Sequence, residues 1–155
     1  MPGSLSDEQL VSTLQHYLTV LQGHPNAETM MAEVLTEDFE TGFVGGQVWK
    51  GIDGLREFLG QRDGFFDEKH TIDELLERGE SGGDVEAHTR LHFFLRSWAA
   101  PSPVSQEYTG SCFHTWRVRD MDGQWRVAAQ MVERFDDLND NSERLFATPE
   151  EGLNR

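Results

Sequence analysis

The sequence of 155 residues contains a single cysteine, Cys112, and no long apolar run. One cysteine cannot form an intramolecular disulfide or a cysteine-based zinc site, so nothing indicates an oxidising compartment and we expect a cytoplasmic protein. No segment approaches the roughly 18 apolar residues that a membrane helix needs, and no basic segment followed by an apolar core opens the chain. The sequence therefore predicts a protein that is neither exported nor attached to a membrane.

Basic residues are also scarce, because 13 Lys and Arg stand against 28 Asp and Glu, for a formal net charge of −15. A charge of this sign repels phosphate backbones and anionic membrane surfaces, so nucleic acid is not an expected partner. The acidic residues are spread over the chain and indicate solubility rather than a function.

Sequence signals for metals, nucleotides and nucleophiles are missing as well. No acidic repeat resembles a calcium loop, and neither a phosphate-binding glycine loop nor a Gly-x-Ser-x-Gly elbow occurs. His88 and His92 stand four residues apart on an expected strand, which separates them by roughly 13 Å and prevents them from sharing an ion. We therefore expect no metal and no cofactor.

Helical spacing governs the first part of the chain. Residues 6–21 begin with the capping-box pair Ser6 and Gln9 and continue with apolar residues at helical intervals. Asn26 is placed to cap a second amphipathic helix, and Asp53 to cap a third, short one in GIDGLREFL.

From residue 69 onward the pattern alternates as in strands. Four strands are expected, at about residues 69–78, 84–98, 105–119 and 124–135. Three helices followed by an antiparallel meander predict an α+β fold, with the N-terminal helices packed on a curved, mainly antiparallel sheet. We expect one domain over residues 1–155, with a core at about 6–136 and a polar, partly mobile tail at 137–155.

Four segments, LQHYLTVL, LTEDFETGF, VWKGIDGLREFL and HTWRVRDMDGQWRV, together resemble a known superfamily over roughly residues 9–135. They resemble the nuclear-transport-factor-2-like superfamily and, within it, the SnoaL-like polyketide cyclases and related isomerases and dehydratases. The resemblance implies a cone whose helices and concave sheet enclose a deep pocket. It indicates the fold more strongly than the reaction, because such folds serve enzymes, binding proteins and assembly domains alike.

Strand alternation shows which polar side chains lie among apolar ones. Cys112, His114 and Trp116 share one apolar row, and Met131 and Glu133 share another on the last strand. An unpartnered buried carboxylate is costly, so Glu133 needs a partner or a water-filled cavity.

The turn DMDGQ between these strands favours a register that places His114 opposite Ala129 and Glu133 opposite Gly110. Small residues would then leave room for a ligand, with His114 and Glu133 on either side of it. A structural core histidine and a solvated carboxylate at the strand end are the alternatives.

The resemblance assigns roles to two of these residues. LQHYLTVL is similar to the ketosteroid isomerase pattern in which a tyrosine on the first helix donates to a developing oxyanion, and Tyr17 matches that tyrosine. His114 falls where those isomerases have a second donor. Their aspartate base corresponds to about Gly42 or Phe43, so this chain departs from them, and Asp38 and Glu40 just upstream are reserve carboxylates.

His70 opens KHTIDELL and resembles the histidine that reaches the pocket as acid or base in SnoaL-like and scytalone-dehydratase-like proteins. The second histidine of the dehydratases has no counterpart here. Trp49 packs beneath the third helix or forms an aromatic wall for a flat ligand. The other residues expected to bind substrate are Phe43, Cys112, Trp116 and Met131.

The strand at residues 84–98 has an apolar row and a second row rich in arginine and aromatic residues, which are enriched at interfaces. The second row consists of His88, Arg90, His92, Phe94, Arg96 and Trp98. We expect it to lie on the outer sheet face and to form a homodimer interface.

These observations predict a cofactor-independent enzyme that performs acid–base chemistry on a small, hydrophobic, oxygenated molecule, as a cyclase, isomerase, dehydratase or epoxide hydrolase. The expected catalytic residues are Tyr17, His70, His114, Glu133, Asp38 and Glu40. The alternative is a noncatalytic binding or assembly module of the same fold, whose pocket its own side chains would fill.

Overall fold

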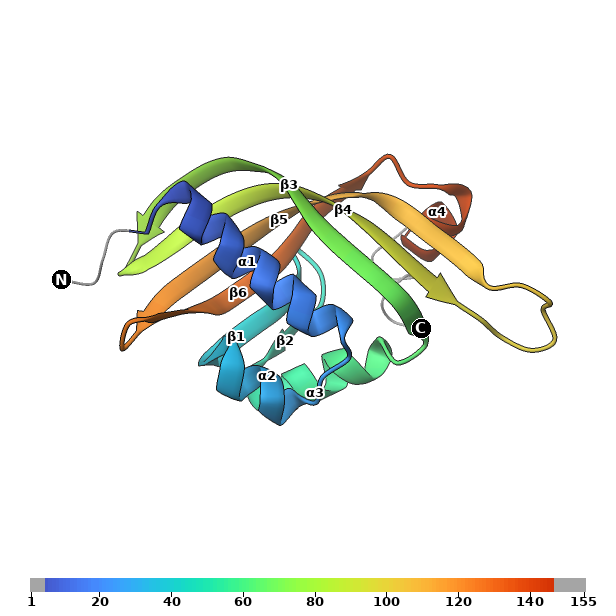
Figure 1. Ribbon diagram of the computed structural model, residues 1–155, viewed down its shortest axis with the longest axis horizontal. Coiled ribbons are helices and arrows are strands. Elements are labelled where there is room, and N and C mark those ends of the chain that lie inside the picture. The colour runs from blue at the N-terminus through green and yellow to red at the C-terminus, as the bar shows by residue number, and fades with distance from the viewer. Residues whose placement is uncertain (1–4, 147–155) are drawn as a thin grey trace.

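Six strands and four helices make up the computed structural model, which describes residues 5–146. The strands are β1 (Leu35–Phe43), β2 (Val48–Lys50), β3 (Phe65–Ser81), β4 (Asp84–Ser97), β5 (Gln106–Met121) and β6 (Gln124–Asp136). The helices are α1 (Asp7–Gln22), α2 (Ala27–Glu33), α3 (Gly51–Gln61) and α4 (Asp140–Phe146). The α+β class with three N-terminal helices on a curved sheet is therefore confirmed, with α4 as an addition (Figure 1).

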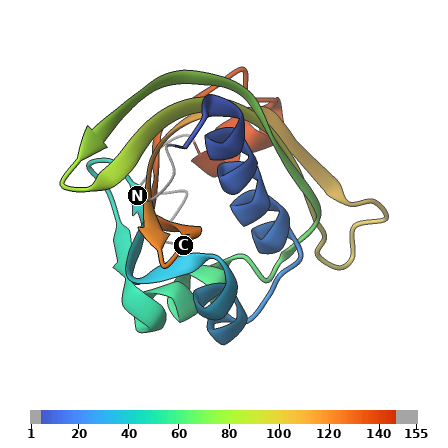
Figure 2. The same ribbon diagram turned by 60° about the vertical axis from the view of Figure 1, so that its left-hand side comes forward.

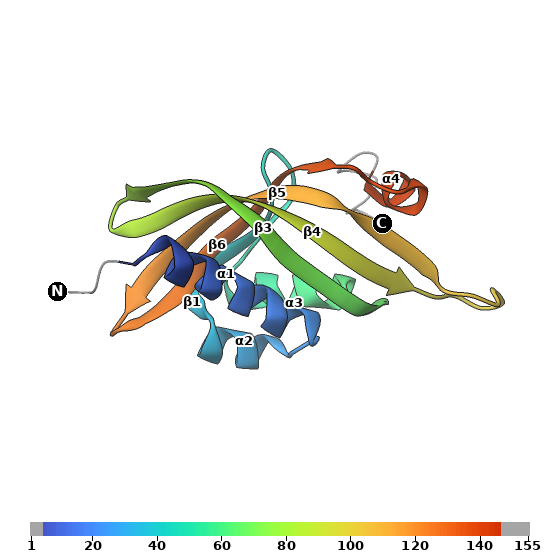
Figure 3. The ribbon, with the colours of Figure 1, turned by 45° about the horizontal axis from the view of Figure 1, so that its top comes forward.

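The strands form one sheet in the order β2-β1-β6-β5-β4-β3. All neighbours pair antiparallel except β1 with β6, which are parallel. The long strands curve around α1 (Figure 2), and α1, α2 and α3 all lie on the concave side of the sheet (Figure 3). None of the helices within residues 5–146 is long and apolar enough to span a membrane.

The first two helices begin as their capping residues predict. Ser6 accepts a 3.1 Å hydrogen bond from the backbone of Gln9, whose side chain bonds back to the Ser6 backbone at 2.9 Å. Asn26 accepts from the backbone N–H of Thr29 at 2.8 Å. These bonds satisfy N–H groups that have no partner inside the helix.

Asp53, expected to cap α3, does not do so. The helix begins two residues earlier, at Gly51, and its N-cap Lys50 makes no side-chain capping bond. Gly51 has φ of +64°, a left-handed conformation that glycine adopts without strain, and this turns the chain from β2 into α3. Asp53 lies in the first helical turn and pairs instead with Arg56 at 2.8 Å.

Side chains of α1 hydrogen-bond to backbone groups of β3, an edge strand of the sheet. Gln15 donates to the carbonyl of His70 at 2.8 Å and accepts from the N–H of Ile72 at 3.0 Å, while Gln22 accepts from the N–H of His70 at 3.0 Å. The two glutamines supply hydrogen bonds that a neighbouring strand would otherwise provide.

Two irregularities in β6 change which side chains face inward. Val118 pairs with Val127 but Arg117 pairs with Ala129, and His114 pairs with Val132 but Phe113 pairs with Arg134. Ala128 and Glu133 are therefore extra residues on β6, as in β-bulges, and each reverses the alternation beyond it. The expected pairing of His114 with Ala129 is wrong because the turn places Val118 opposite Val127 rather than Trp125, and because the bulge at Ala128 shifts the register by one further residue.

The segment after β6 was expected to be a polar tail, yet part of it packs on the domain. Leu138, Leu145 and Phe146 are partly buried against the core, and the Phe146 ring stacks on Phe135 with centroids 4.4 Å apart. The expected tail at residues 147–155 lies outside the described residues.

Candidate functional site

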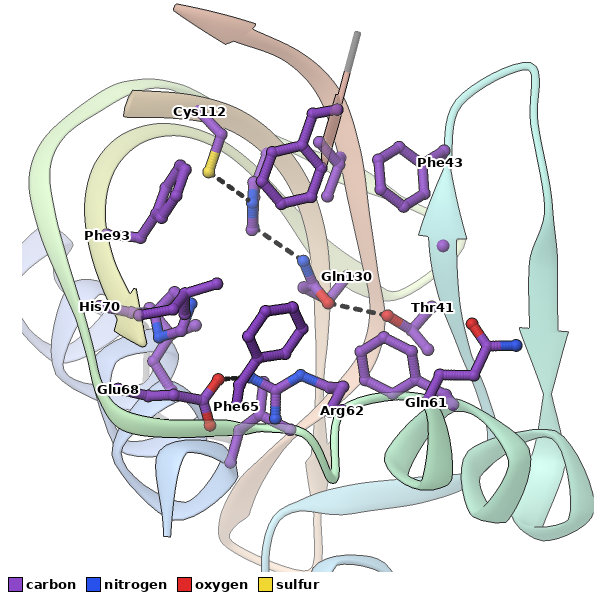
Figure 4. Close-up of a pocket in the computed structure, with 18 of the residues that line it drawn as sticks. Thr41, Phe43, Gln61, Arg62, Phe65, Glu68, His70, Phe93, Cys112 and Gln130 are labelled. Atoms are coloured by element: carbon purple, nitrogen blue, oxygen red, sulfur yellow. Dashed lines mark hydrogen bonds and ion pairs between the residues drawn. The ribbon is translucent and has the colours of Figure 1, made fainter. Parts of the chain in front are cut away.

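A largely apolar cavity of about 330 Å³ lies between the helices and the concave face of the sheet. Every strand and the helices α1, α3 and α4 contribute to its lining, so it forms only when the whole domain is folded. Among its polar lining residues are Thr41, Arg62, Glu68, His70, His114 and Gln130 (Figure 4). A pocket of this size, with few polar groups among apolar walls, is typical of a small-molecule site.

His114 lies on the inner face of β5, only 4% exposed, and lines the cavity. Its Nδ1 accepts a hydrogen bond from the Gln130 amide at 2.8 Å, and its Nε2 is 3.2 Å from the Cys112 sulfur. Because a neutral imidazole has one donor and one acceptor nitrogen, the proton sits on Nε2. Burial lowers the pKa of His114 to about 3, so this neutral form is the stable one.

Gln130 is the centre of the buried polar network (Figure 4). Its carbonyl oxygen accepts from Thr41 at 2.8 Å and from the Tyr17 hydroxyl at 3.3 Å. Two hydroxyl donors on the oxygen direct the amide nitrogen toward His114, which fixes the imidazole ring.

Tyr17 stands behind this network rather than at the cavity surface. It is fully buried, packs edge-on against Trp116 and is not part of the lining. Burial raises the pKa of its hydroxyl, which therefore stays protonated. The expected direct donation to a substrate does not fit this placement; Tyr17 orients Gln130 instead.

His70 lies on β3 at the opposite side of the cavity from Thr41 (Figure 4). Its Nδ1 is buried without a hydrogen-bond partner among the described residues, and its ring stacks on Phe93 with centroids 6.4 Å apart. Burial, and then the positive charge of Arg62, lower the pKa of His70 to about 3. His70 is thus a neutral imidazole with an unused nitrogen.

Arg62 and Glu68 form an ion pair in the cavity wall (Figure 4). The Glu68 side chain is fully buried, and its second oxygen is 2.5 Å from Nε2 of His24. Burial raises the pKa of the Glu68 carboxyl more than the charges of Arg62 and His24 lower it. No sequence pattern singled out these three residues, because their pairing depends on how α3 meets the start of β3.

Trp49 both packs beneath α3 and forms part of the cavity wall, the two alternatives expected from the sequence. It is 3% exposed, packs against Phe58 of α3 with ring centroids 5.3 Å apart, and also lines the cavity. A Cβ on Gly54 would come within 2.9 Å of the Trp49 backbone, so only glycine allows this approach of α3. Phe43 and Cys112 line the cavity as well.

Glu133 was expected beside the ligand but lies on the outer face. As a bulge residue it turns away from the cavity, hydrogen-bonds to Thr115 and pairs with Nδ1 of His88 at 3.0 Å. The Thr115 hydroxyl, followed by His88, lowers the pKa of Glu133. An ionised carboxylate outside the cavity cannot serve as its base.

The reserve carboxylates are also absent from the cavity lining. Asp38 pairs with Arg119 at 3.0 Å, and this bond is the main cause of its lowered pKa. Glu40 pairs with Arg117 at 3.4 Å and with Lys50 at 3.8 Å. Arginines on β5 therefore hold both carboxylates away from the site.

Two residues expected to contact the ligand, Trp116 and Met131, lie outside the cavity lining. Trp116 is fully buried in the core and donates its indole N–H to Thr89 at 2.9 Å. Met131 pairs across the sheet with Thr115, on the face opposite the cavity, because the bulge at Ala128 has reversed the alternation. The same reversal brings Gln130 inside, although its sequence row was expected to face out.

The outer face of β4 carries the row expected there, and its charged members are largely paired. Arg90 and His92 both contact Asp73, and Arg96 contacts Glu107 at 3.2 Å. Trp98 remains 55% exposed at the end of the row. A homodimer through this row is a prediction.

The fold and the cavity together define an α+β cone that encloses a small-molecule pocket. A family model described as the SnoaL-like domain matches residues 4–130, and the chain belongs to this family. A sequence search of curated proteins gave no match.

Several solved structures of differently described proteins share this fold. A proposed scytalone dehydratase from Novosphingobium aromaticivorans is 17% identical, with 84% of each chain covered and a TM-score of 0.62. ActVI-ORFA from Streptomyces coelicolor is 17% identical over 82% of this chain and 94% of its own, with a TM-score of 0.61. A type 2 hexachlorocyclohexane dehydrochlorinase (LinA) is 12% identical over 83% and 86%, with a TM-score of 0.62. At these identities the likeness shows the fold alone.

Proposed function

We propose that the protein is a cofactor-independent enzyme that performs acid–base chemistry on a hydrophobic, oxygenated small molecule. The reaction classes are cyclisation, isomerisation, dehydration and epoxide opening. The observation that carries the proposal is that Nδ1 of His70, a buried residue in the wall of an apolar cavity, has no hydrogen-bond partner within residues 5–146. Two structures of the same fold are named for eliminations, as a dehydratase and a dehydrochlorinase, and an elimination requires removal of a proton.

His70 is the proposed base. Its lowered pKa keeps the imidazole neutral, which is the form that accepts a proton. Negative charge that develops on a bound substrate raises the pKa of the nearby imidazole, because an opposite charge favours the protonated ring. The base therefore becomes stronger as the reaction proceeds.

His114 is the proposed donor. Among the described residues its Nε2–H contacts the Cys112 sulfur, which is a weak acceptor, so a substrate oxygen beside Nε2 can replace this contact at small cost. Gln130 holds the other ring nitrogen and keeps the donor tautomer in place. In this arrangement His114 donates a hydrogen bond and does not change its charge.

A ligand-binding protein without turnover is the second candidate. The observation that favours it is the burial of both cavity histidines, which lowers their pKa well below the neutral range in which histidine catalysis is most efficient. An assembly module with a filled pocket fits less well, since a cavity of about 330 Å³ remains.

Exchange of carbon-bound hydrogen separates the two candidates without knowledge of the natural substrate. The protein is incubated in heavy water with 2-tetralone, a bicyclic apolar ketone with acidic hydrogens beside its carbonyl, and deuterium uptake is followed by mass spectrometry. We expect faster uptake than in buffer, and a loss of about 10²-fold or more in His70→Gln, as removal of a positioned base produces.

His16→Gln is the matched control, because His16 is an exposed histidine of α1 and should leave the exchange rate unchanged. Tight binding of 2-tetralone without accelerated exchange would assign the cavity to the binding protein.

The homodimer and the cytoplasmic location belong to the same proposal. The homodimer rests on the outer row of β4, and the cytoplasmic location rests on the single, buried, free cysteine.

A further inference from the structure

Arg62 is the C-cap residue that follows α3 and presents its guanidinium group to the cavity. Figure 4 shows it joined to Glu68 at the end of the cavity away from Cys112. The side chain is 13% exposed, so most of it is removed from water.

The guanidinium is held in place from two sides. Glu68 binds its Nη2, and the ring of Phe58 lies under it with 5.8 Å between Cζ and the ring centroid. A planar cation fixed by a carboxylate and an aromatic ring has lost its rotational freedom before any ligand arrives. Little further ordering is needed when a ligand binds it.

One nitrogen of the guanidinium group is free to donate a hydrogen bond to a ligand. Nη1 of Arg62 is buried and has no hydrogen-bond partner among the described residues, and the same holds for Nε1 of Trp49 in the same cavity wall. Both nitrogens can only donate. Buried donors normally have acceptors, and leaving one without an acceptor is costly, so this cavity is short of acceptors.

We infer that Arg62 binds an oxygen acceptor of the cavity's ligand, a carbonyl or carboxylate oxygen, and thereby selects ring-sized apolar molecules that carry such a group. The inference rests on the proposed function in taking the cavity as the ligand site. It adds the chemical group that the ligand must carry and the residue that recognises it.

Three naphthalene derivatives of nearly equal shape test this. The probes are 2-acetylnaphthalene with a carbonyl, 2-naphthoate with a carboxylate, and 2-ethylnaphthalene with no acceptor, and their binding is measured by equilibrium dialysis. We expect at least one of the oxygen-bearing probes to bind the parent about 10-fold or more tighter than 2-ethylnaphthalene, because a hydrogen bond to a charged group is worth at least that factor. Tighter binding of the naphthoate identifies an acid as the ligand class, and tighter binding of the ketone identifies a carbonyl compound.

Arg62→Met should abolish this preference and leave the binding of 2-ethylnaphthalene unchanged. Arg56→Met is the control, since Arg56 lies on the same helix but is exposed and pairs with Glu28 and Asp53. The double variant Arg62→Met with Glu68→Gln repeats the measurement without a buried carboxylate that has lost its partner. If either variant has a lower melting temperature, the other supplies the comparison.

Equal binding of all three probes by the parent would overturn the inference and leave the proposed function standing. An equal loss for all three probes in both Arg62 variants would show a structural role and would also overturn it. If the parent binds none of the probes, the cavity is not a ligand site, and the inference fails together with the proposed function.

Discussion

Gln130 donates a hydrogen bond of 2.8 Å to Nδ1 of His114, and this bond decides which imidazole nitrogen carries the proton. Gln130→Leu should lower the free energy of unfolding by about 1 to 3 kcal/mol, because the His114 ring and the Thr41 hydroxyl lose their buried partner. Urea denaturation of this variant, of His114→Leu and of the double variant gives the coupling energy. The double variant should lose less than the sum of the two single changes, and strict additivity would argue against the bond.

His114→Ala should lower the rate of 2-tetralone deuteration by about 10²-fold or more, since an oxyanion donor typically contributes that much. Cys112→Ala is the matched change, because it removes only the weak sulfur contact and should leave the rate near that of the parent. If His114→Ala melts at a lower temperature yet exchanges and binds the ketone as the parent does, His114 is a structural residue.

Stability should fall steeply on mild acidification. Burial lowers the pKa of His70 and His114 to about 3, so between pH 6.5 and 3 the unfolded chain binds two protons that the folded chain does not. Each such proton lowers the free energy of unfolding by about 1.4 kcal/mol per pH unit as the pH falls through this window.

Between pH 6 and pH 5, the change of the unfolding free energy with pH comes mainly from histidines, because most carboxylates titrate at lower pH. His70→Gln should reduce this slope by about one proton, and His16→Gln, at an exposed site on α1, is the matched control. Chemical denaturation at several pH values measures it. An unchanged slope in His70→Gln would mean that His70 titrates normally in the folded protein.

Cys112 should react slowly with thiol reagents in the native protein. The side chain is 4% exposed, and burial raises the pKa of its thiol, so little thiolate is present. Labelling with a maleimide at pH 8 should be at least about 10²-fold slower than in urea. Native labelling at the rate of the unfolded chain would show that the cavity opens readily.

The homodimer prediction concerns the outer row of β4, where Trp98 is 55% exposed. Light scattering at micromolar concentration should give twice the chain mass of 17.7 kDa. Trp98→Lys should weaken the dimer, while Val44→Lys, at a residue 59% exposed in the β1–β2 connection, should not. A parent of monomeric mass would remove the prediction, and a dimer insensitive to Trp98→Lys would place the interface elsewhere.

The three N-terminal helices and the meander of β3 to β6 could be predicted because local signals carry them: caps, periodicity and turn residues. The family was predicted from the resemblance of four sequence segments, and the family model confirms it. The helix α4 could not, because DNSERLF has only Leu145 and Phe146 as apolar residues and their burial depends on contacts with distant rings such as Phe93 and Phe135. The strand β1 was not predicted either, since a shift in its pairing with β6 between Leu35 and Glu40 breaks its alternation.

In the site, placement could be predicted wherever a strand alternates regularly, as for His114 and Cys112 on β5. It failed on β6, where the extra residue Ala128 leaves no mark in the sequence and exchanges the faces of Met131 and Gln130. The placement of Arg62 in the cavity wall depends on how α3 packs against β3, which no local sequence pattern encodes. The catalytic roles of the residues that do line the cavity remain proposals.

The glutamines of α1 have a mechanical effect on His70. Both main-chain groups of His70 that point away from β4 are bonded to Gln15 and Gln22, so the backbone that carries the imidazole is fastened to the helix. Leu18 and Leu21, between these glutamines, form part of the cavity wall. The helix that forms this part of the cavity wall and the backbone of His70 are therefore coupled through these hydrogen bonds.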